Sequence, residues 1–303
     1  MRSLGTDNYE ISGSLFEARS AFARVPLSLD GSPTDTTRVD NSRFDVWFEA
    51  SYNRFEGSQT SFGHFGVAYI GADYLVSEDL LVGFLVQYDD ISDTSIDNNQ
   101  VVSGNGWMAG PYVTARVSEN LYFDGRFAYG QSSNYMNRNL NGLGTGGTGN
   151  FDTTRWLVNA SLTGDYAMDK IWRFQPNASL SYIEEKQEAF TDSTGAFTGS
   201  QTVSMGQLRL GPNFSGQFEG KDGLFYSPTF SFDAIYNFNS GNSSGSTSST
   251  SDDADGLRGR IEAGIGIASK NGVRVDLNAN YDGIGQSNYE AWGASIKFLI
   301  PFD

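Results

Sequence analysis

The chain has 303 residues, contains no cysteine and carries a formal net charge of -16. The absence of cysteine excludes disulfide bonds, thiolate metal sites and cysteine nucleophiles. The acidic balance argues against nucleic acid as a partner, because phosphate recognition requires a basic surface.

Residues 14 to 25 are predicted to form the only convincing helix. Ser14 and Glu17 have capping-box spacing, and Pro26 ends the helical pattern. Its apolar and charged residues are too mixed for a helix in the core of a soluble protein. We expect it to lie inside a polar tube made by the residues after it; a short surface helix ahead of a β domain is the alternative. The residues predicted to act in this lumenal helix are Leu15, Glu17, Arg19, Phe22 and Arg24.

Residues 27 to 42 are rich in turn formers, so we expect residues 1 to 42 to form a linker and residues 43 to 303 one β domain. From Arg43 onward, apolar and polar residues alternate with a period of two, which is typical of strands with two different faces. We predict twelve strands, at 43–53, 64–76, 80–90, 105–117, 121–132, 154–167, 171–184, 203–218, 224–238, 257–268, 273–283 and 289–302.

The predicted connections alternate between tight turns, such as 77–79 and 118–120, and longer polar loops, except at the last hairpin near Gly285. This asymmetry is typical of outer-membrane barrels, whose periplasmic turns are short and whose extracellular loops are long. No apolar run is long enough for a membrane helix, but the averaged hydropathy of a barrel strand conceals its oily face. We also find no signal peptide, and expect an export signal to lie upstream or to have been removed. The long loops are low in complexity, and we expect them to be mobile.

Aromatic residues on the apolar face gather near both ends of the predicted strands. Such girdles mark the two headgroup levels of a membrane. The outer girdle is predicted to contain Tyr52, Tyr88, Trp107, Tyr129, Trp156, Tyr182, Tyr236 and Trp292, and the inner one Tyr74, Tyr166, Trp172, Phe218, Tyr226 and Phe302. A soluble sandwich or barrel is the alternative, but it has no physical reason to sort its aromatic residues by height.

The opposite face is polar and must line a wet or paired interior, because ionisable groups are costly in hydrocarbon. The predicted lumen-lining residues are Arg126, Arg173, Arg209, Arg260 and Glu262. Glycines also point inward, at Gly71, Gly83 and Gly293 among others; we expect either a close approach of the helix or bends for barrel curvature. Pro111, Pro176, Pro212 and Pro228 fall within the predicted strands; since proline lacks a ladder donor, they predict bulges there or errors in those strand assignments.

Catalytic, metal and cofactor motifs are not found. His64 is the only histidine, no serine is an evident partner for it, and we expect a rim residue. The acidic stretch 252–255 does not have the spacing of a calcium loop, and the glycine-rich stretch 142–149 lacks the lysine of a phosphate cradle. We therefore predict no catalytic residue, no metal site and no cofactor.

The chain resembles the C-terminal translocator domain of autotransporters, the type V self-exporting proteins of Gram-negative bacteria. The resemblance rests on SLFEARSAFA at 14–23, DVWFEASYNRF at 45–55, GADYLVSEDLLVGFLVQYD at 71–89, YFDGRFAYG at 122–130 and AWGASIKFLIPF at 291–302. It implies a twelve-stranded transmembrane β-barrel with the N-terminal helix inside the pore. It also implies an assembly signal at the last strand, at Gly293, Ile296, Phe298 and Phe302, although Asp303 follows the usual final aromatic residue.

The function that the resemblance implies is export of an N-terminal passenger, absent from this chain, to the bacterial surface. The expected partners are outer-membrane lipid and lipopolysaccharide, the barrel assembly machinery and the passenger itself. The barrel is expected to be a monomer. Its long loops are expected to be extracellular, and its N- and C-termini periplasmic. A free-standing porin or channel, an outer-membrane hydrolase that uses His64, and an adhesin that acts through its loops are the alternatives.

Overall fold

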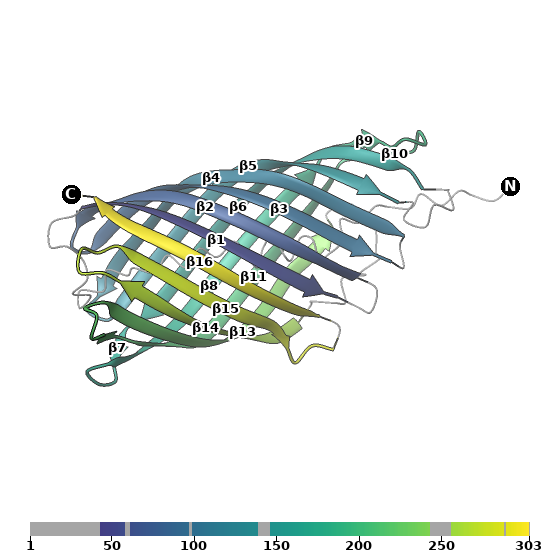
Figure 1. Ribbon diagram of the computed structural model, residues 1–303. Coiled ribbons are helices and arrows are strands. Elements are labelled where there is room, and N and C mark those ends of the chain that lie inside the picture. The colour runs from purple at the N-terminus through teal and green to yellow at the C-terminus, as the bar shows by residue number, and fades with distance from the viewer. Residues whose placement is uncertain are drawn as a thin grey trace.

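A single antiparallel wall that closes on itself accounts for nearly all of the structure (Figure 1). The computed structural model describes residues 43–57, 61–96, 99–138, 146–242, 256–287 and 289–302. The wall strands are β1 (Phe44–Glu56), β2 (Ser61–Ser77), β3 (Leu80–Ser95), β4 (Gln100–Ser118), β5 (Leu121–Asn137), β6 (Thr148–Gly164), β8 (Trp172–Gln187), β11 (Gln201–Gly216), β13 (Phe225–Asn242), β14 (Gly256–Ala268), β15 (Arg274–Ile284) and β16 (Glu290–Phe302).

Each wall strand pairs with its neighbours in chain order, and β1 pairs with β16 to close the barrel. Two short strands, β7 (Tyr166–Ala167) and β12 (Phe218–Glu219), continue β6 and β11, and β9 (Phe190–Thr191) pairs with β10 (Phe197–Thr198) in a separate hairpin. The predicted twelve-stranded antiparallel barrel is confirmed. The predicted lumenal helix at 14–25 lies outside the described residues. Within the ranges given above, no helix is long and apolar enough to cross a membrane.

The two ends of the barrel differ, and we name them by their connections. At the turn end, short connections join β2 to β3, β4 to β5, β7 to β8, β12 to β13 and β14 to β15, as the sequence predicts. One of them is fixed by Asp169, whose carboxylate accepts hydrogen bonds from the backbone amides of Trp172 and Ile171, and these bonds hold the pKa of Asp169 below its ordinary value.

At the opposite, loop end, the expectation that every connection except the last is long is wrong. β2 begins at Ser61, soon after β1 ends at Glu56, and β4 begins at Gln100, soon after β3 ends at Ser95. The strands from β2 to β6 have 16 to 19 residues, whereas β14, β15 and β16 have 11 to 13. The sequence prediction ends β3 at 90 and begins β4 at 105, because the alternation of apolar and polar residues weakens beyond the lipid-facing part. Because of this difference in strand length, the wall is taller on the side formed by β2 to β6 than on the side formed by β14 to β16.

The outer face of the wall is apolar over its middle and ends in aromatic residues. Phe84, Val86 and Tyr88 of β3 are each about half exposed, while Leu85 and Gln87 between them are buried. Tyr88 lies opposite Trp107, and Tyr129 lies opposite Trp156, in the backbone register at one level. Near the turn end, Tyr74, Tyr166, Trp172 and Phe218 are also exposed. The exposed aromatic side chains thus stand at two heights, as expected for a barrel in a bilayer.

Two inward glycines are explained by large neighbours on the inner face. A Cβ atom at Gly71 would overlap the Trp47 ring, and one at Gly83 would overlap the Tyr112 ring. The indole Nε1 of Trp47 donates to the Tyr112 hydroxyl at 2.7 Å, and that hydroxyl donates to Asp73 at 2.8 Å. Here glycine allows an aromatic ring to lie flat on the neighbouring strand, which is the close approach that glycine in a strand permits.

The predicted bulges at the strand prolines are wrong. Pro212 of β11 lies directly opposite Pro176 of β8, and the register on either side is unchanged. The register is likewise the same before and after Pro111, between Ala109 and Tyr112. A proline removes only one donor, and the ladder bonds on both sides hold the register across that gap. The register shifts between β2 and β3 and between β4 and β5 lie instead near strand ends, at Leu75/Ser77 and Arg116/Ser118.

Candidate functional site: the barrel interior

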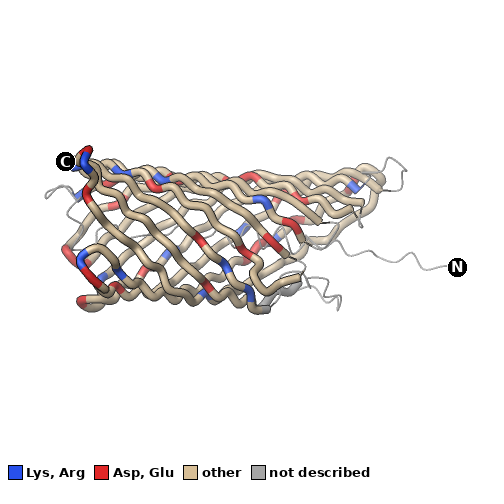
Figure 2. Tube along the Cα trace, turned by 60° about the horizontal axis from the view of Figure 1, so that its bottom comes forward, with Lys and Arg blue, Asp and Glu red and all other residues tan. Residues whose placement is uncertain are grey.

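Acidic and basic residues are interspersed along the wall rather than separated by sign (Figure 2). One fully buried ion pair joins β3 to β6 on the inner face. Arg155 contacts Asp89 with both terminal nitrogens, at 3.0 Å and 2.5 Å, and the side chains are 1% and 0% exposed. A bidentate guanidinium-carboxylate pair out of contact with water is among the strong charge-assisted interactions in proteins. It fixes two strands that are not adjacent in the wall.

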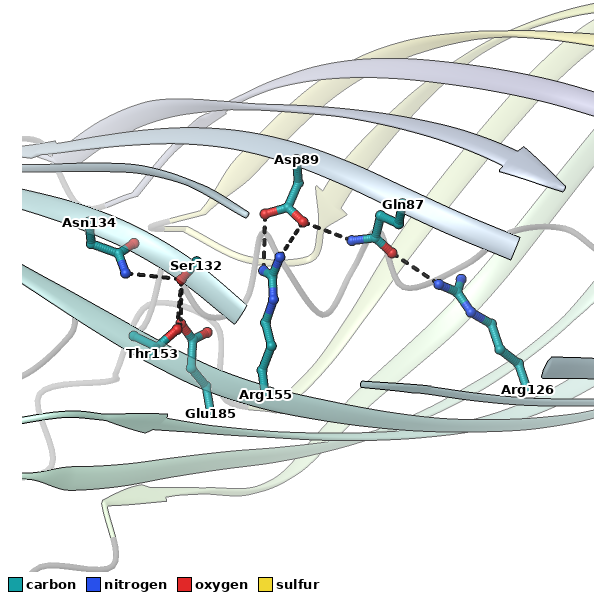
Figure 3. A network of polar contacts seen from close by, with 8 residues as sticks. All are labelled: Gln87, Asp89, Arg126, Ser132, Asn134, Thr153, Arg155 and Glu185. Carbon is teal, nitrogen blue, oxygen red and sulfur yellow. Dashed lines mark hydrogen bonds and ion pairs between the residues drawn. The ribbon is translucent and has the colours of Figure 1, made fainter. Parts of the chain in front are cut away.

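A second basic group extends this network toward the turn end (Figure 3). The Gln87 amide donates to Asp89 at 3.0 Å and accepts from Arg126 at 3.0 Å. Arg126 also lies over the Tyr69 ring, 5.4 Å from its centroid. Because Arg126 is only 4% exposed, these contacts with inner-face side chains take the place of water around its guanidinium.

A third part of the network lies on β5, β6 and β8. The Thr153 hydroxyl donates to Glu185 at 2.6 Å and lies 2.6 Å from the Ser132 hydroxyl, to which Asn134 donates at 3.0 Å (Figure 3). The hydroxyls of Thr153 and Ser132 and the Asn134 amide thus supply hydrogen bonds around a buried carboxylate. The arrangement positions polar side chains and contains no nucleophile activated by a histidine.

The other predicted lumen-lining residues lie on the inner face, each beside a carboxylate or a base. Arg173 donates to Asp165 at 2.6 Å, and Arg209 forms an ion pair with Asp233. Arg260 contacts Glu262 at 2.9 Å, so these two predicted residues are brought together. Arg126, Arg173 and Arg209 are held by separate partners. Their predicted contacts with Glu17, Arg19 and Arg24 fall outside the described residues.

The sequence analysis missed Asp89, Arg155 and Glu185, which form the centre of the interior. A signal was available, because each stands next to an outward residue of the aromatic girdle or its edge: Tyr88, Trp156 and Glu184. Period-two alternation places the neighbour of an outward residue inside. Alternation does not predict which inner-face side chains contact one another, because β3 and β6 are separated by two strands.

Near the loop end the inner face carries apolar side chains beside polar ones. The inner face carries a group of apolar residues that we call the collar: Phe55, Phe65, Ile91, Val102, Met136, Phe151, Phe190, Tyr289 and Ala291, all at most 9% exposed. Phe65 lies opposite Ile91 across β2 and β3, and Val102 lies opposite Met136 across β4 and β5. On the outer face at the same level stand polar residues such as Asp90, Ser103 and Asp152.

The hairpin of β9 and β10 completes the collar on one side. It lies at the end of the barrel opposite the end of β16 (Figure 1). Phe190 stacks on Phe151 with ring centroids 5.2 Å apart, and Ser193 donates its amide to Thr148 at 2.8 Å. Asp192 accepts from the Thr194 hydroxyl and from the amides of Thr194 and Ala196, and the Thr194 hydroxyl is the main cause of its lowered pKa. These bonds and the Phe190 contact give residues 188–200 a defined hairpin, which the low complexity of this loop does not predict.

His64 lies on the outer face of β2. Its ring stacks on Tyr52 with centroids 5.8 Å apart, and its Nε2 is 3.8 Å from Asp90. In the part of the chain that the structure describes, no group of three or more histidine, cysteine, aspartate or glutamate residues is placed to hold a metal ion. The acidic stretch 252–255 falls outside that part.

The residues of the predicted assembly signal belong to β16, the closing strand. Ile296 and Phe298 alternate with the buried Lys297 and face outward, whereas Gly293 faces the interior opposite Asn53 of β1. Phe302 is paired with Phe44 at the end of the seam. Their part in recognition by assembly machinery stays a prediction.

A comparison with protein families places this barrel. The family described as Autotransporter beta-domain matches residues 46–282 of the chain. The chain belongs to the autotransporter β-domain family. It is therefore an outer-membrane translocator barrel of that family. The comparison with curated protein sequences found no match.

Solved structures of autotransporter barrels share the fold at low sequence identity. The translocator domain of NalP from Neisseria meningitidis aligns with a TM-score of 0.75 at 14% identity, covering 96% of this chain and all (100%) of that one. The β domain of the Bordetella autotransporter BrkA aligns at 0.69 and 17% identity, covering 86% and 100%. The transport unit of AIDA-I from Escherichia coli aligns at 0.64 and 14% identity, covering 95% and 96%.

Proposed function

We propose that this barrel carries a passenger segment, attached ahead of residue 1, across the outer membrane to the cell surface. The proposal divides the chain into a linker at 1–42, with a lumenal helix at 14–25, and a barrel at 43–303. The loop end faces outward and the turn end faces the periplasm. Lipid with lipopolysaccharide surrounds the barrel, which is a monomer, and the barrel assembly machinery inserts it.

The observation that carries the proposal is a charged inner face that is closed to solvent. Asp89, Arg155, Glu185 and Arg258 are each at most 1% exposed. In a wide, water-filled pore such groups would stay hydrated, and burying them is costly unless partners surround them. A polar segment inside the barrel supplies such surroundings, and this favours a filled translocator over an open porin.

Charge supports the same occupant. Among the buried residues of the described wall, carboxylates outnumber basic groups. The predicted helix contributes Arg19 and Arg24 against Glu17. A segment of positive net charge inside a wall with excess carboxylates is electrostatically favourable, the more so because the interior is screened less than the surface.

Single-channel recording tests the filled pore. The complete chain and a chain lacking residues 1 to 26 are inserted in planar bilayers. We expect small conductance from the first and at least several-fold larger conductance from the second, because the deletion opens the lumen. Unchanged conductance after deletion would favour a free-standing channel and count against the proposal.

Surface display tests export itself. An epitope-tagged passenger is fused ahead of residue 1 behind an export signal, and its accessibility to protease is measured on intact cells. A matched fusion whose barrel lacks β16 serves as the control, since it has no seam. Equal protection of the tag in both fusions would refute export by this barrel.

A further inference from the structure

The strands from β3 to β6 continue past the outer aromatic girdle, and their outward side chains there are polar. Tyr88 of β3 lies opposite Trp107 of β4 at the girdle, and both are about half exposed. Beyond them, outward residues pair in the backbone register across all four strands and form two rows. The first row is Asp90, Asn105, Ser133 and Asp152, and the second is Ser92, Ser103, Tyr135 and Asn150.

The two rows surround a shallow groove on the outer face of the wall. All of their members except Ser92 line this groove, whose volume is about 420 Å³. Asp90 is 61% and Tyr135 41% exposed, so a ligand from outside can reach them. The Ser133 hydroxyl donates to Asp152 at 2.8 Å, and His64 lies at one edge, 3.8 Å from Asp90. Because paired strands carry every lining residue, the groove has a fixed shape.

The height of the groove places it just outside the hydrocarbon. Two strand residues at about 3.4 Å each, tilted by about 40°, rise roughly 5 Å along the barrel axis. The two rows therefore stand roughly 5 and 10 Å beyond the girdle, whose aromatic rings mark the headgroup level. On the opposite side, β16 begins at Glu290, two residues ahead of Trp292, so the wall there ends at the height of the first row.

The chemistry of the lining excludes two kinds of ligand. No lysine or arginine lines the groove, so a phosphate would meet carboxylates without a compensating charge. Asp90 and Asp152 lie on β3 and β6, three strand spacings apart, which is roughly 14 Å and too far for one metal ion to bridge. The ligand is therefore neither a bare phosphate nor a single cation.

The same lining suits a ligand with many hydroxyl groups. Sugar hydroxyls both donate and accept, the carboxylates accept, and the amides of Asn105 and Asn150 do both. The ring of Tyr135 offers an apolar face on which the apolar side of a sugar ring can pack. A row of roughly 14 Å is longer than one sugar ring, so the groove suits a short chain of sugars.

We propose that this groove binds the core sugars of lipopolysaccharide in the surrounding outer leaflet. The proposal rests on the outward orientation of the loop end under the proposed function, and it adds the site and the part of the lipid that is recognised. An exported polypeptide leaves through the lumen, whereas the groove faces away from it, so the surrounding glycolipid is the favoured ligand. The tall side of the barrel then holds its lipid neighbours by their sugars.

Two lipopolysaccharides that share lipid A test the groove, one with the complete core and one truncated after its first sugars. The 303-residue chain is folded in detergent micelles, and native mass spectrometry gives an apparent dissociation constant for each. We expect the complete form to bind at least fivefold more tightly. The preference should vanish in the double variant Asn105→Ala, Asn150→Ala, because each hydrogen bond contributes about two- to tenfold in affinity.

Glu290→Ala is the matched control. Glu290 stands two residues ahead of girdle residue Trp292, as Asn105 stands ahead of Trp107, but on the side of the barrel away from the groove. This variant should keep the preference. Heat-modifiable gel migration reports folding, and the two single asparagine variants, each with at least a twofold loss of preference, replace the double variant if it does not fold.

Equal affinity of the unchanged chain for the two lipopolysaccharides overturns the proposal, and so does a preference that survives in the double variant or falls equally in the control. If the double variant keeps the preference but displays less passenger, the groove serves the exported polypeptide, and the proposal is wrong. Failure of export with the preference intact overturns the translocator role alone. An epitope inserted beside Gly195 and hidden on intact cells would show that the loop end faces inward, and the groove would not meet lipopolysaccharide.

Discussion

Breaking the pair of Asp89 and Arg155 tests whether the interior is dry. Asp89→Leu leaves the Arg155 guanidinium buried without its bidentate carboxylate. Arg155→Met leaves the Asp89 carboxylate buried without its guanidinium. Since both side chains are at most 1% exposed, each single change should lower the free energy of unfolding by about 3–5 kcal/mol. The double variant should lose less than either single variant, because an apolar pair often replaces a buried ion pair at little cost.

The measurement is denaturant unfolding of the barrel in lipid vesicles, followed by tryptophan fluorescence and heat-modifiable migration. Glu56→Gln is the matched control, because the Arg54–Glu56 contact at 3.2 Å joins side chains that are 65% and 51% exposed. It should change the free energy by at most about 1 kcal/mol. If Asp89→Leu costs no more than Glu56→Gln, water reaches the network, and the reasoning that the interior is filled is wrong.

Gly83→Ala should lower the midpoint of thermal unfolding, because its Cβ would overlap an aromatic ring, whereas Gly66→Ala, whose Cβ is 3.9 Å from its nearest neighbour, should leave that midpoint nearly unchanged. Equal midpoints would show that the ring moves freely. The pKa of Asp169 is below its ordinary 3.8, so its carboxylate stabilises the fold above pH 3.8 and loses this effect as the pH falls further; the stability difference from Asp169→Asn should therefore be constant at neutral pH and shrink in acid, and a difference that grows in acid contradicts it. Phe190→Ala should expose residues 188–200 to limited proteolysis, whereas Phe197→Ala, at a side chain 72% exposed, should not; equal cleavage of the two would refute the packing role of Phe190.

Alternation of side-chain type was sufficient to predict the wall. The strand that includes Val46 and Phe48 and the strand that includes Trp156 and Val158 both lie where the period-two pattern puts them, and the tight turns at 77–79 and 118–120 are correct. A membrane requires this pattern on every strand, because lipid covers one face and the interior covers the other. The strand count and the turn end could therefore be predicted.

The loop end could not be predicted by the same rule. Beyond Tyr88 and Trp107 the outer face is polar, so Ser103 looks like a loop residue although its strand continues. The interior contacts were also beyond reach, since the pairing of Asp89 with Arg155 depends on the curvature of the wall rather than on sequence distance. The collar residues Ile91 and Val102 were missed because they lie past the predicted strand ends.

The seam between β1 and β16 has a consequence for the order of assembly. It joins Phe44 to Phe302, the first and last residues of the described wall, whereas every other pairing joins strands that follow each other in the chain. Contacts between such distant residues form late, because a long stretch of chain must first be ordered. Until the final hairpin arrives the cylinder has a lengthwise slit, and a polypeptide could be laid inside it from the side instead of being threaded through an end.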